Sequence, residues 1–168
     1  VGKGFEQKTV FLPQLLLSAE AAKAAFEQVK EHITASGEEK YPVILATVKG
    51  DIHDIGKNIV KVLLESYGFP VIDLGRDVAP ERIVQEAKQR NVPLVGLSAL
   101  MTTTVGAMEE TIKLLRRDAP NCKVVVGGAV LTEDFARQIG ADKYAADAME
   151  TVRYAEELLT NLTQTKYE

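Results

Sequence analysis

The sequence predicts a doubly wound α/β domain, with a five-stranded parallel sheet of flavodoxin-like order flanked by helices and preceded by a partial helical cap. Short, continuously apolar segments recur from residue 42 onward, as expected of parallel strands buried on both faces. Between them, apolar residues recur at the three- and four-residue steps of amphipathic helices. Strands that alternate with helices in this way form a parallel sheet with right-handed crossovers.

Composition and charge limit the classes of partner. The 168 residues suit one medium domain with an appendage, and a formal net charge of -4 gives no electrostatic reason to expect nucleic acid or an anionic membrane. No apolar run approaches the roughly 20 residues that span a bilayer, and no signal peptide is recognised. The single Cys122 excludes an internal disulfide, so we expect a reducing, cytoplasmic setting. Because the chain begins at Val1, we expect a processed product or a piece of a longer protein.

The N-terminal part, residues 1–35, is predicted to be the remnant of a helical cap. Pro13 suits the first position of a helix, where its missing N–H costs nothing. Apolar residues then follow at helical spacing: Leu15, Leu16, Ala19, Ala22, Phe26, Val29 and Ile33. Such a stripe needs a partner, so an incomplete cap predicts self-association or a partner helix. Residues 36–41 are the expected linker to the main domain, residues 42–168.

Five strand–helix units are predicted in the main domain. Gly68 follows the first of the helices at the favoured stop position, and Pro80 opens the second at its first turn. The predicted strands are Val43–Val48, Val71–Leu74, Leu94–Ser98, Lys123–Val126 and Lys143–Ala145. The predicted helices are Gly56–Tyr67, Pro80–Arg90, Val105–Arg117, Glu133–Ile139 and Ala148–Leu162.

The loops at the carboxyl ends of the strands are where an open α/β sheet binds its ligands. The loop after the third strand, residues 98–104, carries four hydroxyl groups. The loop after the fourth strand begins with Gly127 and Gly128, and residues without bulk let a ligand approach the backbone closely. Hydroxyls on one loop beside glycines on the next predict a slot between two strands for a flat or elongated group.

The loop after the first strand, residues 49–58 (KGDIHDIGKN), carries the strongest signal for chemistry. It places His53, two carboxylates and two glycines between a strand and a helix. Asp51 lies two residues before His53 and is suited to accept one ring N–H, the support that metal-bound imidazoles nearly always have. Three plainer interpretations stay open: an exposed loop histidine, a turn role for Asp51 and a helix N-cap role for Asp54.

Four other kinds of site fit this loop poorly. A phosphate loop G-x-x-x-x-G-K-[ST] requires one residue fewer between Gly50 and Gly56, and a hydroxyl where Asn58 stands. The dinucleotide fingerprint G-x-G-x-x-G is absent from the sequence. A phospho-acceptor receiver domain requires an aspartate in place of Ser98. A zinc site requires three or four ligands, and apart from His53 and its neighbouring carboxylates no His or Cys is expected at this rim. What remains is a cofactor that brings its own metal and most of its ligands and needs one protein imidazole.

These residues resemble a known signature. Asp51-x-His53-x-x-Gly56, then Ser98-x-Leu100, then Gly127-Gly128 is similar to the D-x-H-x-x-G, S-x-L and G-G motifs of cobalamin-binding domains. The three parts stand in the same order on successive strand ends, and the resemblance covers essentially the whole chain. The segment 11–16 (FLPQLL) resembles the end of the helical cap in cobalamin-dependent methionine synthase and related corrinoid methyl carriers.

The resemblance implies roles for particular residues. His53 would be the lower axial ligand of cobalt in place of the cofactor's own base, the base-off/His-on mode. Asp51 would hydrogen-bond His53, and Thr104, where methionine synthase has a serine, would hydrogen-bond Asp51. Phe11 would shield the upper, methyl-bearing face. The remaining implied cofactor-binding residues line the nucleotide-tail slot and its surroundings: Gly50, Ile52, Asp54, Gly56, Ser98, Leu100, Thr102, Gly127, Gly128 and Ala148.

The implied function is that of a methyl carrier, not catalytic alone. The chain would hold cobalamin, as methylcobalamin or cob(I)alamin, and present the methyl group to substrate-binding methyltransferase domains or subunits, with a reactivation partner. Methyltetrahydrofolate to homocysteine, in methionine biosynthesis, is the preferred donor and acceptor pair. The alternatives are a corrinoid protein of a methanol, methylamine or O-demethylase system, an adenosylcobalamin mutase module, and a cofactor-free receiver-like domain.

Overall fold

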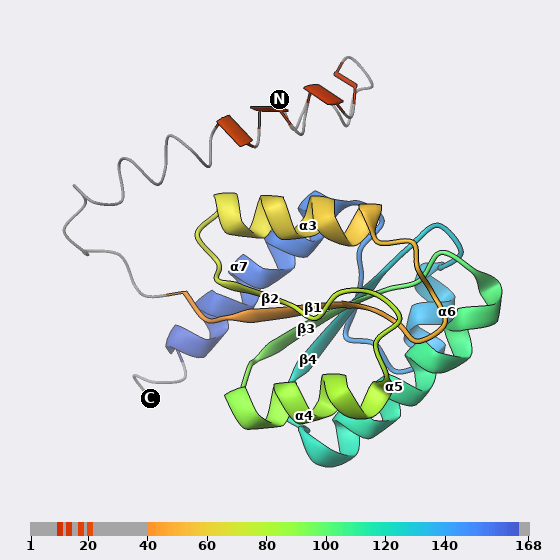
Figure 1. Cartoon of the computed structure of the whole chain (residues 1–168). Helices are drawn as coiled ribbons and strands as arrows, with labels where there is room; N and C mark the ends of the chain where they lie inside the picture. The colour runs from red at the N-terminus through yellow and green to blue at the C-terminus, as the bar shows by residue number, and fades with distance from the viewer. Residues whose placement is uncertain (1–9, 12, 15–16, 19, 22–39, 165–168) are drawn as a thin grey trace.

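The computed structural model describes residues 10–11, 13–14, 17–18, 20–21 and 40–164 (Figure 1). Its centre is a five-stranded parallel sheet of order β2-β1-β3-β4-β5. The strands are β1 Val43–Thr47, β2 Val71–Asp73, β3 Leu94–Ser98, β4 Lys123–Gly127 and β5 Lys143–Tyr144. This is the predicted flavodoxin-like order, and its switch point lies between β1 and β3, where such sheets bind ligands.

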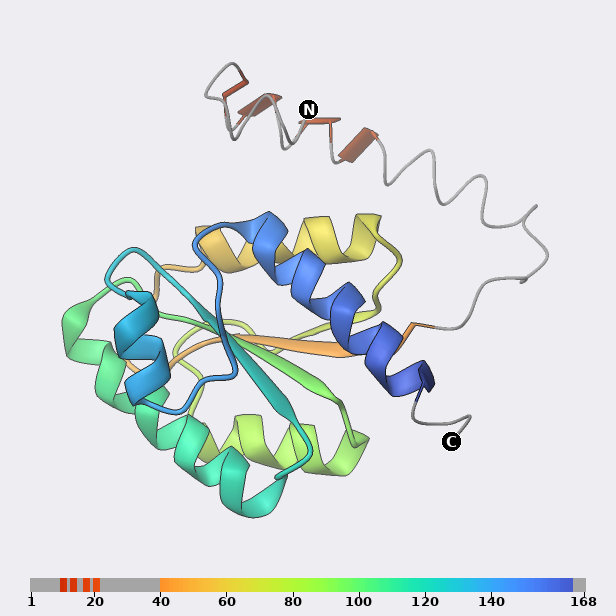
Figure 2. The ribbon, with the colours of Figure 1, turned by 180° about the vertical axis from the view of Figure 1, so that it is seen from behind.

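Helices cover both faces of the sheet (Figures 1 and 2). On one face α3 (Ile55–Ser66) packs against α7 (Ala148–Gln164). On the other face α4 (Pro80–Arg90) packs against α5 (Val105–Asp118), and α6 (Glu133–Gln138) contacts β5. The structure is therefore a three-layer α/β/α domain whose strand ends form one rim.

The alternation of side chains along β1 explains why both faces need helices. Val43 and Leu45 belong to the apolar cluster under α3 and α7, while Ile44 and Ala46 belong to the cluster under α4 and α5. Side chains alternate between the two faces of a strand, so a continuously apolar strand is buried only when both faces are covered.

The predicted elements from β1 onward all form, with small shifts at their ends. α3 begins at Ile55, one residue before the predicted start, and α7 continues to Gln164. A short 3-10 helix, η1 (Thr102–Thr104), precedes α5 and was not predicted. β5 has two residues, one fewer than predicted, and as an edge strand it pairs only with β4 in the described sheet.

The start of the main domain is attached to α3 and α7. The hydroxyl of Tyr41 donates to the carbonyl oxygen of Ala155 at 2.6 Å, and its ring meets the Phe69 ring edge-on. Lys40 Nζ donates to the carbonyl oxygen of Tyr67 at 2.7 Å and lies 4.4 Å from the centre of the Phe69 ring. The chain therefore enters the domain at a fixed point on α3 and α7.

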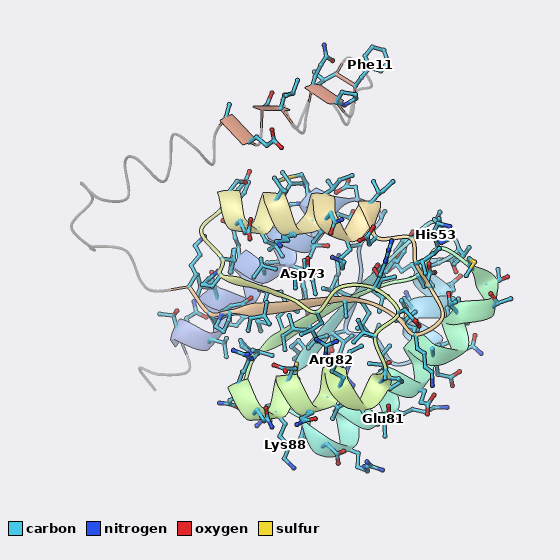
Figure 3. The ribbon with its side chains drawn as sticks, viewed as in Figure 1. Phe11, His53, Asp73, Glu81, Arg82 and Lys88 are labelled. Atoms are coloured by element: carbon cyan, nitrogen blue, oxygen red, sulfur yellow. The ribbon has the colours of Figure 1, made fainter. Side chains whose placement is uncertain are left out.

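Most of the predicted cap, residues 1–35, lies outside the described residues. Its described pairs 13–14, 17–18 and 20–21 are helical. Phe11 is 72% exposed and lies apart from His53 (Figure 3), so its shielding role stays a prediction. Among the described helices, none has the length and apolar content needed to cross a membrane.

Candidate functional site

The loops at the carboxyl ends of the strands enclose a cavity of about 750 Å³. It extends inward to Leu45, Gly96 and Val125, between the sheet and the α3/α7 layer. Nine of the predicted site residues line it: Ile52, His53, Asp54, Gly56, Ser98, Leu100, Gly127, Gly128 and Ala148. The rim and the slot that the sequence predicts separately are therefore one continuous space.

Asp51 is fully buried behind the wall of this cavity, and both of its carboxylate oxygens are engaged. Oδ1 accepts from the backbone N–H of His53 at 3.0 Å and lies 2.8 Å from ring Nδ1 of the same residue. Oδ2 accepts from the N–H groups of Leu100 and Met101, at 2.7 and 3.2 Å, and from the Thr104 hydroxyl at 3.0 Å. The carboxylate thus joins the β1–α3 loop to the segment after β3.

The surroundings of Asp51 keep it charged. Burial alone would raise the pKa of its carboxyl, but hydrogen bonds from the N–H groups of His53 and Leu100, the His53 ring and the Thr104 hydroxyl hold that pKa well below its ordinary value. The Thr104 hydroxyl is also 2.8 Å from the carbonyl oxygen of Met101 and has one proton to share between the two acceptors. The backbone N–H donors therefore stabilise the carboxylate whichever way the hydroxyl turns.

The charge on Asp51 determines which nitrogen of His53 carries the proton. An ionised carboxylate can only accept, so Nδ1 is the donor and a neutral imidazole keeps its free lone pair on Nε2. The His53 side chain is 46% exposed at the edge of the cavity (Figure 3). The described residues contain no group of three or more His, Cys, Asp or Glu that would hold a metal ion. The site therefore presents one oriented imidazole at the edge of the cavity.

Thr47 and Ser98 form a hydroxyl pair beside the cavity, with 2.8 Å between their oxygens. Thr47 is fully buried, and Ser98 is the hydrogen-bond partner of its hydroxyl in the described structure. If Ser98 donated, the buried Thr47 proton would have no acceptor, which is costly. Thr47 is therefore the donor, and the Ser98 proton is left for a group inside the cavity that Ser98 lines.

The paired glycines keep the slot free of side chains. Gly128 has a φ of 141°, and a Cβ there would overlap the carbonyl oxygen of Ala99. At Gly127 a Cβ would lie 3.4 Å from the carbonyl oxygen of Ala145. The backbone of the β4–α6 loop consequently forms one wall of the cavity directly.

A buried ion pair attaches α3 to the edge strand β2. The Lys57 side chain is 2% exposed, and its Nζ donates to Oδ1 of Asp73 at 2.7 Å. Burial would raise the pKa of the Asp73 carboxyl, but Lys57, the N–H of Gly75 and Lys61 together lower it. The sequence analysis missed Lys57, because a lysine in the first turn of an amphipathic helix is also typical of a solvent-facing position.

The structure leaves several predicted site residues out of the cavity wall. Asp51 and Thr104 are buried behind it and support the residues that line it, and Gly50 is exposed and bonded to Asp77. Thr102 begins η1 and is exposed. Asp54 occupies the N-cap position of α3, but its side chain makes no capping hydrogen bond, so the N-cap interpretation of its side chain is wrong.

Comparisons with known proteins agree with this geometry. The family model described as B12 binding domain matches residues 41–153. The chain is 45% identical over 163 residues to dimethylamine corrinoid protein 1 of Methanosarcina acetivorans, which covers 95% of this chain and 76% of that protein.

Two solved structures are similar over nearly the whole chain. One is a cobalamin-binding protein from Desulfitobacterium hafniense, with a TM-score of 0.83 and 34% identity, covering 93% of this chain and 75% of that one. The other is the methanol:cobalamin methyltransferase complex MtaBC from Methanosarcina barkeri, with a TM-score of 0.81 and 32% identity, covering 94% of this chain and 61% of that one. The chain therefore belongs to the B12 binding domain family, and its cofactor is a cobalamin.

Proposed function

We propose that this chain carries a methyl group on cobalamin for a methyltransferase system, with His53 as the lower axial ligand of cobalt. The observation that carries the proposal is the His53–Asp51 pair. A buried carboxylate holds Nδ1 at 2.8 Å and leaves Nε2 free at the edge of a cavity of about 750 Å³. This is the supported imidazole that metal-binding histidines have.

The residues present fit a corrinoid. A single imidazole suits a metal that arrives inside a macrocycle, because the macrocycle supplies the remaining ligands. Ile52, Ile55 and Leu100 are exposed apolar side chains around His53, suited to the flat face of a large ring. The cavity beside Gly127 and Gly128 would hold the nucleotide tail of a cobalamin bound with His53 in place of the cofactor's own base.

When bound, the cofactor supplies a cobalt centre that accepts and releases a methyl group. Asp51 orients the imidazole and stabilises its Nδ1 proton, and Thr104 and two backbone N–H groups hold Asp51 in place. The Ser98 hydroxyl would be available to donate to an acceptor on a tail bound in the cavity.

For the methyl donor we propose a small methylated amine. A relative that is 45% identical is named for dimethylamine, and the similar MtaBC complex acts with methanol, which makes methanol the second candidate. The methyltetrahydrofolate and homocysteine pair that the sequence analysis preferred has no support in these comparisons. Its alternative, a corrinoid protein of a methanol or methylamine system, is the better supported.

The partner that this proposal requires is a substrate-binding methyltransferase subunit. The MtaBC structure is a complex of a methyltransferase with its corrinoid protein. A reactivation partner stays a prediction from the family resemblance. The chain is in this view the methyl-carrying module of an enzyme rather than the whole catalyst.

Absorption spectra of the purified chain incubated with hydroxocobalamin test the cofactor and its ligand. We expect a His-on corrinoid spectrum for the native sequence and a base-off spectrum for His53→Ala. The matched control is His32→Ala, which removes the other histidine of the chain and is expected to leave the His-on spectrum unchanged. A His-on spectrum in His53→Ala would show that the ligand assignment is wrong.

The methyl donor is tested separately with reduced, cofactor-loaded protein. Each donor, dimethylamine, methanol or methyltetrahydrofolate, is added with a methyltransferase of the matching class, and methylation is followed by the change in the corrinoid spectrum. We expect conversion with the amine system. Conversion with methyltetrahydrofolate alone would contradict the proposed donor but leave the cofactor assignment intact.

A further inference from the structure

Asp77, in the loop between β2 and α4, has a left-handed backbone with φ 52°. Among the described non-glycine residues only Asn91 shares a positive φ, and Asn91 is the C-cap of α4, where a left-handed residue ends the helix. Asp77 ends no helix. Its conformation therefore needs another explanation, and strained residues of this kind gather at functional sites.

Two hydrogen bonds join Asp77 to the loop that carries His53. Oδ1 of Asp77 accepts from the backbone N–H of Gly50 at 2.7 Å. The backbone N–H of Asp77 donates to the carbonyl oxygen of Asp51 at 3.0 Å. Asp77 thus binds both the N–H of Gly50 and the carbonyl oxygen of Asp51. A parallel β-bridge between Val48 and Val78 also joins the two loops.

A turn alone does not account for an aspartate here. Glycine adopts a left-handed backbone without the clash that a Cβ causes, so a position that only reversed the chain would favour glycine. Aspartate accepts the strain more readily than most residues, and here its carboxylate binds Gly50. The side-chain bond therefore explains the residue at this position.

Gly50 connects Asp77 to Asp51 through the backbone. Gly50 is itself left-handed, with φ 84°, and a Cβ on it would lie 3.4 Å from Cγ2 of Thr104. The Gly50 backbone, although exposed to solvent, thus contacts Asp77 on one loop and lies close to Thr104 on another. Its next neighbour is Asp51, whose carboxylate orients the His53 ring.

We propose that Asp77 is a positioning residue for the axial ligand: it fixes the Gly50–Asp51 backbone so that Asp51 presents Nε2 of His53 in one orientation. Asp77 acts through Asp51 and is not itself part of the cavity wall. The part of the inference that concerns cobalt rests on the proposed function. The part that concerns the loop does not, because it can be measured without a cofactor.

Two substitutions at Asp77 and one control elsewhere test the role of the side-chain acceptor. Asp77→Gly removes the acceptor and also relieves the strain, while Asp77→Asn keeps an oxygen acceptor and a residue type that tolerates left-handed backbone. Asn91→Gly is the matched control, because it relieves the same kind of backbone at a helix end on another part of the fold. Folding of each variant is checked by thermal unfolding.

The cofactor-free readout is proton NMR. In the native chain and in Asp77→Asn we expect a resolved, downfield resonance of the His53 Nδ1 proton and slow exchange of the Gly50 amide proton. In Asp77→Gly we expect the ring resonance to broaden and the Gly50 amide to exchange at least tenfold faster. A Gly50 amide that exchanges freely in the native chain would overturn the proposal even if Asp77→Gly failed to fold.

The cofactor-loaded readout is electron paramagnetic resonance of the cobalt(II) form, in which nitrogen splitting reports axial imidazole. We expect the His-on fraction to fall several-fold in Asp77→Gly and to stay near the native value in Asp77→Asn and Asn91→Gly. The positioning role would be overturned if Asp77→Gly kept both the NMR signals and the His-on fraction of the native chain. If the native chain bound no corrinoid, the proposed function would fail while the NMR comparison still decided the role of Asp77 in the loop.

Discussion

Ring Nδ1 of His53 lies 2.8 Å from Oδ1 of Asp51, while the other oxygen of that carboxylate is held by residues that follow β3. The imidazole and the donors that fix its carboxylate therefore come from two loops that are about fifty residues apart in the chain, as the 49-residue separation of Asp51 and Leu100 shows. The orientation of the imidazole depends on both loops at once.

Asp51→Asn is expected to destabilise the fold. An asparagine would replace one of the two carboxylate oxygens by an NH₂ group, which donates and cannot accept. In one orientation this group would face the two N–H donors of His53. In the other it would face the backbone N–H groups of Leu100 and Met101. Leaving such buried groups unpaired costs about 1–3 kcal/mol in the free energy of unfolding, which urea titration measures. Asp54→Asn is the control, because Asp54 makes no capping bond and should change stability by less than about 0.5 kcal/mol. Equal stability of the two variants would contradict the assigned network.

Thr47→Val is expected to weaken cofactor binding with little effect on folding. Valine has nearly the shape of threonine but cannot donate to Ser98, so the Ser98 hydroxyl loses the partner that directs it. A neutral hydrogen bond is worth about 1 kcal/mol, which corresponds to a roughly fivefold increase in the Kd of hydroxocobalamin, measured by absorbance titration. Thr47→Ser keeps the donor and should bind like the native chain. Unchanged binding by Thr47→Val would show that the pair does not orient Ser98.

Gly128→Ala is expected to disrupt the domain, whereas Gly56→Ala is not. A Cβ at Gly128 would overlap the Ala99 carbonyl oxygen, which belongs to backbone and cannot move aside alone, and its φ of 141° disfavours alanine. At Gly56 a Cβ would meet nothing within 4 Å. Gly56 lies in the helix α3, and in helices alanine is favoured over glycine by up to about 1 kcal/mol. Thermal unfolding of both variants checks this, and a native-like melting temperature for Gly128→Ala would refute the predicted overlap.

The Asp142 carboxylate, far from the rim, is expected to make the free energy of unfolding sensitive to acid. Burial would raise the pKa of its carboxyl, but Arg116, the N–H of Val124 and Lys123 lower it. Because the folded pKa lies below the unfolded value of about 3.9, the unfolded state takes up the proton first, and stability is lost as pH falls from about 4 through the folded pKa. Asp142→Asn should lower the unfolding free energy at pH 7 by about 1–3 kcal/mol and flatten this acid dependence in urea titrations. If Asp142→Asn showed the same dependence of the unfolding free energy on pH as the native chain, the role assigned to Asp142 and its partners would be wrong.

The fold follows from local patterns, because each of its decisive features is short-range. Continuous apolar segments such as Val43–Thr47 indicate strands buried on both faces, and Pro80 and Gly68 mark helix ends. The right-handedness of crossovers then limits the possible strand orders, and the flavodoxin-like order is one of the two common doubly wound orders. The η1 turn at Thr102–Thr104 was missed because three threonines have no helical pattern; the Thr104 N–H bonds back to the Met101 carbonyl there.

The site is predictable only where its residues are close in sequence. The Asp51–His53 pair follows from a spacing of two, whereas the Thr47–Ser98 pair and the Gly50–Asp77 contact depend on strand register and loop docking. The preferred methyl donor is less well supported than the methylamine or methanol alternative for a related reason. The motifs that identify the domain are those of cofactor binding, and they carry no information about the methyl donor.

Lys40 and Tyr41 attach the beginning of the domain to α3 and α7. Every residue that lines the cavity follows these two in the chain. Inserting or deleting residues before Lys40 should therefore leave the cavity wall intact, so the length of the preceding chain and the composition of the cofactor site can be varied independently.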